Sequence, residues 1–374
     1  MNAVIALLLC LVSIAQPGDA RPSPEQVRAS IERGLRFLLR TQNAAGSWGS
    51  ASNATYTDLW SNPETHRAWK IGTTGLCCMA LQEQGEAAAA SAAALERGLD
   101  YLLCNADLKR PSDWDLDNVW GHLYGLQALA RALGSARPIA DDRRARLRAA
   151  AAAHLERLVH YQSADGGFGY YANASAAWQP SWSTSFTTAA VLLALLDARD
   201  AQLEVPAAVI TAATRAVKRC RLPSGAYTYS VAAIPAPGSL EGIDQIKGSL
   251  GRIQLCNLVL HRLGAGITSA DLAQGLTLFF AQHRFLDCAH RKPIPHEAYY
   301  LNAGYFYFFG HYHAALAIDC LAPEQRPDFA RQLQAELLRT EDQDGAQWDY
   351  YMHDYVKAYS TACSVLALGH TLAH

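Results

Sequence analysis

Apolar residues at helical spacing open the chain, and the pattern returns along its whole length. In the segment 24–42, PEQVRASIERGLRFLLRTQ, the residues Val27, Ile31, Leu35 and Leu38 form one stripe, with charged residues opposite. Such a stripe is typical of a helix that buries one face. The pattern predicts amphipathic helices at 24–42, 91–104, 141–162, 206–222, 270–283 and 331–340.

Between these segments lie stretches rich in Ala, Leu and Thr that contain no Pro. Two examples are TTGLCCMAL, which ends at Leu81, and TTAAVLLAL, which ends at Leu195. A helix that is apolar nearly all round is a buried helix. The segments of this kind end at Leu81, Leu129, Leu195, Leu260, Ile318 and Leu368.

The order of the predicted helices is therefore amphipathic, then buried, six times over. The simplest packing places the buried helices inside and the amphipathic helices outside. This predicts an all-α fold, an α/α toroid of about six inner and six outer helices. No strand-rich segment or long linker divides the chain, so we expect one domain over residues 21–374. An open solenoid is the alternative, and it would need capping units with a polar outer face.

Composition and charge narrow the possible partners. The net charge is −2 and half of the residues are hydrophobic, which does not fit a nucleic-acid-binding surface. Residues 1–20 carry a short apolar run, 3–15, followed by Pro17 and Gly18. The run is too short to span a bilayer and predicts a signal peptide, so we expect an exported protein, periplasmic or extracellular. An N-terminal apolar anchor is the alternative.

Eight cysteines remain after residue 20, an even number that permits disulfides in an exported chain. Four of them lie in apolar helical runs, where a free thiol acts as a small hydrophobe. The better candidates for pairing are Cys104, Cys220, Cys288 and Cys320.

Four loops that follow predicted outer helices share a pattern: a polar residue, a glycine and an aromatic ring. The first loop, QNAAGSW, has Gln42, Gly46 and Trp48. We expect the glycine to permit the turn, the ring to pack over the end of the outer helix, and the Gln42 amide to satisfy the last carbonyls of that helix. The other loops have Gln162, Gly166 and Phe168; Arg221, Gly225 and Tyr227; and Glu341, Gly345 and Trp348.

With these loops the chain resembles the prenyltransferase and squalene-cyclase repeat superfamily, whose members carry "QW" loops on an α/α toroid. The resemblance extends over nearly all of the chain after residue 20. It implies an aromatic central funnel that holds an apolar, isoprenoid-like ligand. Site and fold remain separate questions, because one fold carries many functions.

Counting back from the final Leu or Ile of each buried segment gives a candidate inward face. Positions eleven, eight, seven, four and one before the end share one side of a helix. They are polar or large near the start of the helix and small near its end, which predicts a funnel open at the inner helices' N-termini. Lys70, Arg252 and Lys357 would lie at this rim, where free N–H groups favour an anion. Alternatively, these cations extend into solvent.

The segment 299–316, YYLNAGYFYFFGHYHAAL, contains no charged residue. On the inward face it would place Tyr307 and His311, and His122 has the same position in the second buried segment. We therefore expect His122 and His311 to face each other across the ring, unless both are satisfied core histidines. Trp182 and Tyr359 lie at comparable depths and extend the aromatic wall.

The sequence DLDN, residues 115–118, opens the second buried segment. It has three of the four letters of the Asp-x-Asp-Asp motif of class II terpene cyclases. That resemblance implies that Asp117 protonates an alkene. Asn118 departs from the motif, and N-capping of the helix is the alternative role for Asp115 and Asp117.

Resemblance to protein prenyltransferase β-subunits implies a zinc ion held by Asp, Cys and His. The sequence offers Asp287, Cys288, His290 and His296, but the Asp-x-Cys spacing of that family is not met. We therefore predict no metal or other cofactor, with zinc as the alternative.

Two further pairs combine an imidazole with a carboxylate. His296 and Glu297 are expected to open the fifth inner helix, and His353 and Asp354 the sixth. Each pair could act in acid–base catalysis or could simply cap its helix.

Three functions remain open on the sequence alone. The first is an isoprenoid-binding or isoprenoid-transforming protein with Asp117, His122, Tyr307 and His311 in the funnel. The second is a non-catalytic toroid that binds a glycan, peptide or protein partner at the same mouth. The third is a glycan-active enzyme that uses Asp354 and Glu297.

Overall fold

Amphipathic and apolar helices alternate along the chain at the predicted places. The computed structural model describes residues 22–50, 62–84, 89–171, 182–231, 242–292, 296–297, 299–349 and 353–374. The amphipathic helices are α1 (Pro24–Thr41), α3 (Ala89–Cys104), α5 (Asp141–His160), α7 (Ala207–Cys220), α9 (Ser269–Ala281) and α12 (Arg326–Arg339). The apolar helices are α2 (Pro63–Gln84), α4 (Asn118–Gly134), α6 (Ser185–Asp200), α8 (Ile246–Arg262), α11 (Phe306–Asp319) and α13 (His353–Leu372). The short helices η2 (Gly242–Asp244) and α10 (Arg284–Asp287) lie between them.

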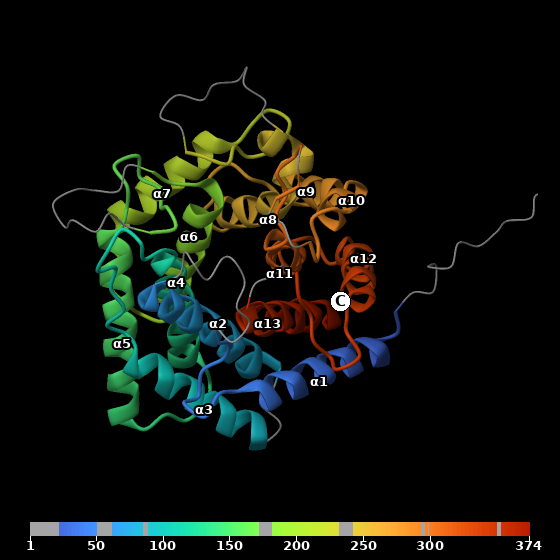
Figure 1. Cartoon of the computed structure of the whole chain (residues 1–374). Helices are drawn as coiled ribbons and strands as arrows, with labels where there is room; N and C mark the ends of the chain where they lie inside the picture. Colours follow the sequence, from blue (N-terminus) through green and yellow to red (C-terminus); the bar gives the residue numbers. More distant parts are fainter. Residues whose placement is uncertain are drawn as a thin grey trace, which may run out of the picture.

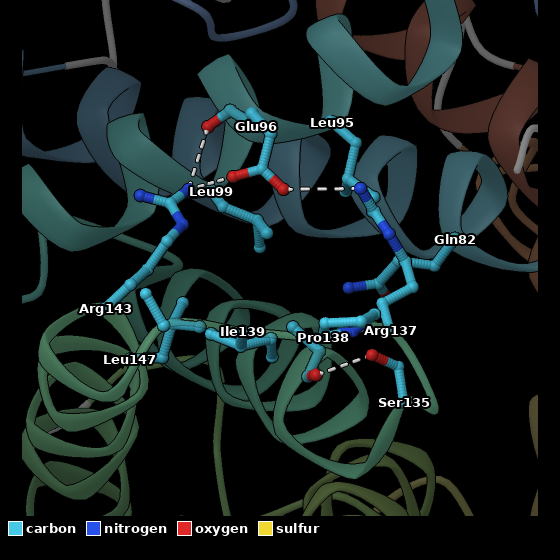
Figure 2. A pocket seen from close by; sticks show the side chains of 12 residues that line it. Gln82, Leu95, Glu96, Leu99, Ser135, Arg137, Pro138, Ile139, Arg143 and Leu147 are labelled. Atoms are coloured by element: carbon cyan, nitrogen blue, oxygen red, sulfur yellow. Dashed lines mark hydrogen bonds and ion pairs between the residues drawn. The ribbon is translucent and has the colours of Figure 1, made fainter. Parts of the chain in front are cut away.

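The apolar helices form an inner ring and the amphipathic helices surround it (Figure 1). Each inner helix packs against the next, from α2 through α4, α6, α8 and α11 to α13. The last inner helix, α13, packs against both α2 and α1, so the ring is closed. The predicted α/α toroid is confirmed. The inner helices are buried on all sides, because one side of each helix faces the ring centre and the opposite side packs against the outer helices.

The loops after the outer helices bind in a way that differs from the prediction. The Gln42 side-chain amide donates to the carbonyl of Gly46 and to that of Ala94 on the next outer helix, α3, at 2.9 and 2.8 Å. The indole of Trp48 donates to the carbonyl of Leu38, at 2.7 Å. The ring therefore satisfies the end of its own helix, while the Gln amide joins that helix to the following one.

The same connection recurs in the other three loops. Gln162 donates to the carbonyl of Val209 on α7, and Arg221 pairs with Asp271 on α9. In the last loop the Glu341 carboxylate accepts from Ser30 and Arg33 on α1. This last contact joins the loop after α12, the last outer helix, to α1, the first outer helix, and so closes the outer wall.

The cysteines of the described part are all free thiols, including the four candidates for disulfides. Cys104 and Cys288 are exposed, whereas Cys220 is buried. The described helices also include none that is both long and apolar enough to cross a bilayer.

Candidate functional site

The inward face of each inner helix differs from the one that the sequence suggested. Trp120, Phe186 and Phe309 lie nine residues before the ends of their apolar segments, and they contact one another from α4, α6 and α11. Thr74 and Thr188, seven before the end, instead accept hydrogen bonds from the outer loops, at 3.1 and 2.9 Å. A shift of two residues turns a side chain by about 200°. The helix face that the sequence analysis expected to line the ring centre therefore faces the outer helices and their loops.

Aromatic rings meet at the N-terminal ends of the inner helices, the end that we call the mouth. The centroids of Trp120 and Phe309, from opposite sides of the ring, lie 6.2 Å apart, so these side chains span the centre. Phe186 packs against Trp120 at 5.8 Å and against Phe306 at 4.9 Å. We call this set the aromatic cluster, and its members are Trp120, Tyr170, Phe186, Tyr229, Phe306 and Phe309. Trp69 instead packs against Tyr355, with ring centroids 5.8 Å apart.

Two further predicted residues border the aromatic cluster. Trp182 meets Tyr170 edge to face at 4.8 Å and is 37% exposed, so it lies at the outer margin of the mouth. Tyr359, nine before the end of its segment, donates from its hydroxyl to the carbonyl of Tyr305 at 3.1 Å.

Asp117 is an acidic group beside the aromatic cluster, three residues before Trp120 and close enough to Tyr229 to interact with it electrostatically. It precedes the first residue of α4 with a left-handed backbone, φ 61°, and its side chain makes no capping hydrogen bond. Its Oδ2 instead accepts from the indole N–H of Trp69, at 2.9 Å. Burial raises the pKa of Asp117 to about 6, although the Trp69 hydrogen bond opposes this shift. The Asp117 carboxyl therefore does not cap α4, which was the alternative role that the sequence allowed.

Asp115, in contrast, points into its own turn. Its Oδ2 accepts from the backbone N–H and the hydroxyl of Ser112, at 3.2 and 2.7 Å. It therefore braces the loop before α4 and leaves Asp117 as the carboxyl of this motif beside the rings.

The predicted pairing of His122 with His311 across the ring is wrong. His122 Nδ1 lies 3.0 Å from Nδ1 of His154 on α5, and His311 Nε2 lies 2.9 Å from Nε2 of His283 beyond α9. Both contacts join an inner helix to the outer wall. Tyr307 points the same way, because its hydroxyl lies 3.4 Å from Asp287. None of these three residues belongs to the aromatic cluster.

Burial favours the neutral form of both predicted histidines. It lowers the pKa of His122 and of His311 well below the usual value, and the neighbouring histidine lowers each further. They fit the alternative that the sequence left open, that of core histidines with a partner.

The predicted cationic rim is only partly formed. Arg252 on α8 is fully buried and donates to the backbone carbonyls of Gly248, Tyr227 and Ile243. It therefore holds the segment before α8 against that helix. Lys357 is exposed and lines a pocket of about 270 Å³ between α13 and the end of α1. Lys70 remains half-buried on α2, next to Trp69.

The members of the predicted acid–base pairs are held by local contacts, and the His353 side chain lies outside the described residues. His296 and Glu297 do not open α11, which begins at Phe306. Their loop is held by a bond of His296 to the carbonyl of Leu301 and by Glu297, which accepts from the backbone of Tyr299. Asp354 does lie in the first turn of α13, as predicted, but it accepts from Ser50 and lines the same pocket as Lys357.

The residues considered for zinc are not brought together. Cys288 is exposed, and His290 stacks on Tyr307 with ring centroids 3.9 Å apart. His296 is held in its own loop. Asp287 instead accepts from Arg339 at 2.8 Å and faces His283, which the sequence did not single out.

Ion pairs close the opposite end of the ring. Arg131 on α4 pairs with Glu83 on α2 and donates to the Tyr312 hydroxyl of α11 at 3.0 Å, across the ring centre. His370 on α13 pairs with Glu83 at 3.3 Å and with Asp319 on α11 at 2.6 Å. Asp197 on α6 extends the set to Arg262 on α8. We call this set the basal girdle, and it lies at the end of the ring opposite the aromatic cluster.

Comparison with known proteins places the fold more firmly than the function. No family model matches the sequence, and no curated protein matches it. The type II terpene cyclase MstE from Scytonema, solved with merosterolic acid A, is similar in structure with a TM-score of 0.56 at 15% identity. That match covers 94% of this chain and 98% of the cyclase.

Two glycan-related structures are equally similar. An α-1,6-mannanase, GH76A of Salegentibacter, matches with a TM-score of 0.55 at 11% identity over 93% of this chain and 99% of its own. A possible GH105 family member from Klebsiella pneumoniae matches with a TM-score of 0.55 at 12% identity over 100% and 99%. What these proteins share with the chain is the α/α toroid fold.

Proposed function

We propose that this toroid binds an apolar, isoprenoid-like compound against the aromatic cluster and protonates one of its double bonds from Asp117. The observation that carries the proposal is the raised pKa of Asp117 beside that cluster. The other carboxyls of the described part whose pKa is displaced all shift downward. Asp117 is thus the carboxyl best prepared to hold a proton near neutral pH.

The proton position follows from the Trp69 contact. Because Trp69 donates to Oδ2, the acid proton resides on Oδ1. Transfer to an alkene carbon breaks the Oδ1–H bond, forms a C–H bond and leaves a carbocation on the neighbouring carbon. The Trp69 N–H then stabilises the new carboxylate. The rings of Trp120, Phe186 and Phe309 would stabilise a cation held against them. Return of a proton from another carbon to the Asp117 carboxylate then restores an alkene and the acid.

A glycan-active enzyme is the second candidate, since two of the similar toroids are glycan-related. Hydrolysis of a glycosidic bond usually employs two carboxyls on either side of the bond. The pair that the sequence suggested, Asp354 and Glu297, is engaged by Ser50 and by the backbone of Tyr299. This arrangement favours the single acid of the first proposal.

Product analysis decides between the functions. The purified chain is incubated with geranylgeranyl dihydroxybenzoate, a ligand of the similar cyclase, or with α-1,6-mannotriose, a ligand of the similar mannanase. We expect a cyclised isomer of the first compound, separable by chromatography at unchanged mass, and no sugar release from the second. Release of mannose would overturn the proposal in favour of a glycosidase.

Two variants test the role of Asp117. Removing a general acid typically costs about 10²- to 10⁴-fold in rate, so Asp117→Asn should lose turnover on that scale. Asp113→Asn is the matched control, because Asp113 is exposed in the same loop. Binding without turnover in the wild-type chain would indicate a non-catalytic toroid. Native mass spectrometry of the protein as purified shows whether it retains a lipid-sized ligand.

We also propose that residues 1–20 direct export and are removed. They lie outside the described residues. N-terminal sequencing of the protein from the exported fraction checks this, and an intact N-terminus there would favour the anchor.

A further inference from the structure

Three potential metal ligands converge on the outer wall, outside the aromatic cluster. His283 follows α9, Asp287 ends α10, and Glu336 lies on α12, and their ligand atoms are all within 4.8 Å of one another. His283 Nδ1 lies 3.2 Å from Asp287 Oδ2 and 3.5 Å from Glu336 Oε2. His283 is 5% exposed, so this nitrogen faces the two carboxylates in a largely dry place.

A chain of hydrogen bonds determines which His283 nitrogen carries the hydrogen. His311 Nδ1 lies 2.7 Å from the carbonyl oxygen of Tyr307, which can only accept, so Nδ1 is the donor. His311 is fully buried against Phe279 and Tyr307, where the neutral ring is favoured, and its Nε2 is then an acceptor. His283 Nε2, 2.9 Å away, must donate to it.

It follows that neutral His283 has a lone pair on Nδ1, directed at two carboxylate oxygens. This lone pair then faces Asp287 Oδ2 and Glu336 Oε2, and of these two oxygens Glu336 Oε2 also accepts a hydrogen bond from Arg339. A cation between the three acceptor atoms would relieve their mutual repulsion. The separations suit one. Ligands at about 2.0–2.1 Å in a tetrahedral zinc site lie about 3.3–3.4 Å from each other, close to the two separations at Nδ1.

Arg339 is the neighbouring group that a cation must accommodate. It donates to Asp287 Oδ1 at 2.8 Å and pairs with Glu336, while the Tyr307 hydroxyl also lies 3.4 Å from Oδ1. The two Asp287 oxygens are thus divided, with Oδ1 held by protein donors and Oδ2 turned to His283. Two carboxylates against one guanidinium leave a net negative charge, and the half-exposed Arg339 side chain has room to move away from Glu336.

We propose that His283 Nδ1, Asp287 Oδ2 and the Glu336 carboxylate bind a divalent transition-metal ion, zinc or manganese, that ties α10 to α12. One imidazole with two carboxylates is a donor set that suits these ions. His311 acts as the positioning residue, because its bond to Nε2 orients the His283 ring, as outer-shell partners do at histidine metal sites. The site shares only Asp287 with the residues that the sequence offered for zinc.

Titration of the metal-free full-length chain with Zn²⁺ tests the site by calorimetry, with Mn²⁺ and Ca²⁺ run in parallel. We expect one equivalent of Zn²⁺ or Mn²⁺ to bind, and the melting temperature to rise with the bound ion. Glu336→Gln and Asp287→Asn should each weaken binding at least about tenfold. Asp328→Asn is the matched control, since Asp328 is an exposed acid on the same helix.

The outcomes that would overturn the proposal are distinct. One is no stoichiometric binding of either transition metal, and another is binding that both Glu336→Gln and Asp287→Asn leave unchanged. A cobalt-loaded chain provides a spectroscopic check, because a sulfur-to-metal charge-transfer band would assign the ion to a cysteine instead. Circular dichroism confirms that each variant is folded before it is scored. All of these readouts are independent of the function proposed for Asp117.

Discussion

Two aspartates show how the same side chain acquires opposite properties from its surroundings. Asp117 is desolvated beside aromatic rings with a single indole N–H as its donor, and its pKa rises to about 6. Asp287 is also partly buried, but the Arg339 guanidinium donates to its Oδ1 at 2.8 Å and helps to hold its pKa far below the usual range. The first carboxyl therefore keeps its proton up to a higher pH than an ordinary aspartate, whereas the second is ionised.

The raised pKa of Asp117 also makes the folded chain sensitive to pH. A group whose pKa is higher in the folded state contributes stability that is lost as the pH rises through that value. Between pH 4 and 8 the wild-type chain should thus lose stability relative to Asp117→Asn, which cannot ionise. Thermal melts of both proteins across this range measure the difference. An unchanging gap would show that Asp117 has an ordinary pKa.

At the scale of elements, periodicity predicted which segments are helical and which lie inside. It could not predict which side of each inner helix faces the ring centre. Both sides are buried, so the 3.6-residue pattern contains no polar side that would distinguish them. Thr74 and His311 looked like inward groups, but their polar atoms find partners on the outer loops and helices. Trp120 and Phe309 instead contact each other at the centre of the ring. The signal available in the sequence was an aromatic residue nine positions before the end of an apolar segment, as at Trp120, Phe186 and Phe309.

The glycines of the connecting loops offer a matched test of packing. Gly46 and Gly225 share a left-handed backbone, φ 87°, so alanine incurs the same strain at both, about 1–3 kcal/mol. A Cβ at Gly46 would lie 2.3 Å from the carbonyl oxygen of Arg97 on α3, whereas at Gly225 the nearest atom is 3.9 Å away. Gly46→Ala should therefore cost at least about 1 kcal/mol more than Gly225→Ala. Urea midpoints compare the two, and equal losses would exclude the helix contact as the cause.

At the scale of the whole molecule, two kinds of contact hold the ring closed. The loops join consecutive outer helices, and Glu341 carries this connection from the last helix back to α1. The basal girdle links the ends of the inner helices, from Asp319 through His370 and Glu83 to Arg131. Sequence periodicity gave no sign of the girdle, because its members lie on different helices and meet only when the ring forms.

His370 makes the girdle dependent on pH. The carboxylates of Asp319 and Glu83 raise the pKa of His370 to about 9. Its contribution to stability is complete below about pH 6.5, the value of an unfolded histidine, and is lost as the pH rises through 9. The wild-type chain should thus become less stable between pH 7 and 10, and His370→Gln should show a smaller loss. Denaturation at several pH values measures this, and parallel curves would contradict it.

The direction of α1 has a consequence for any attachment of the chain to a surface. Gly34 faces Val365, while Phe37 and Thr41 line a pocket with Lys357, so α1 runs antiparallel to α13. The first residue of α1 and the last residue of α13 therefore both lie at the girdle, opposite the mouth. If the N-terminal segment stays in a membrane as a tether, the toroid opens away from that membrane. A lipid substrate would then reach it only after leaving the bilayer, by diffusion or on a carrier.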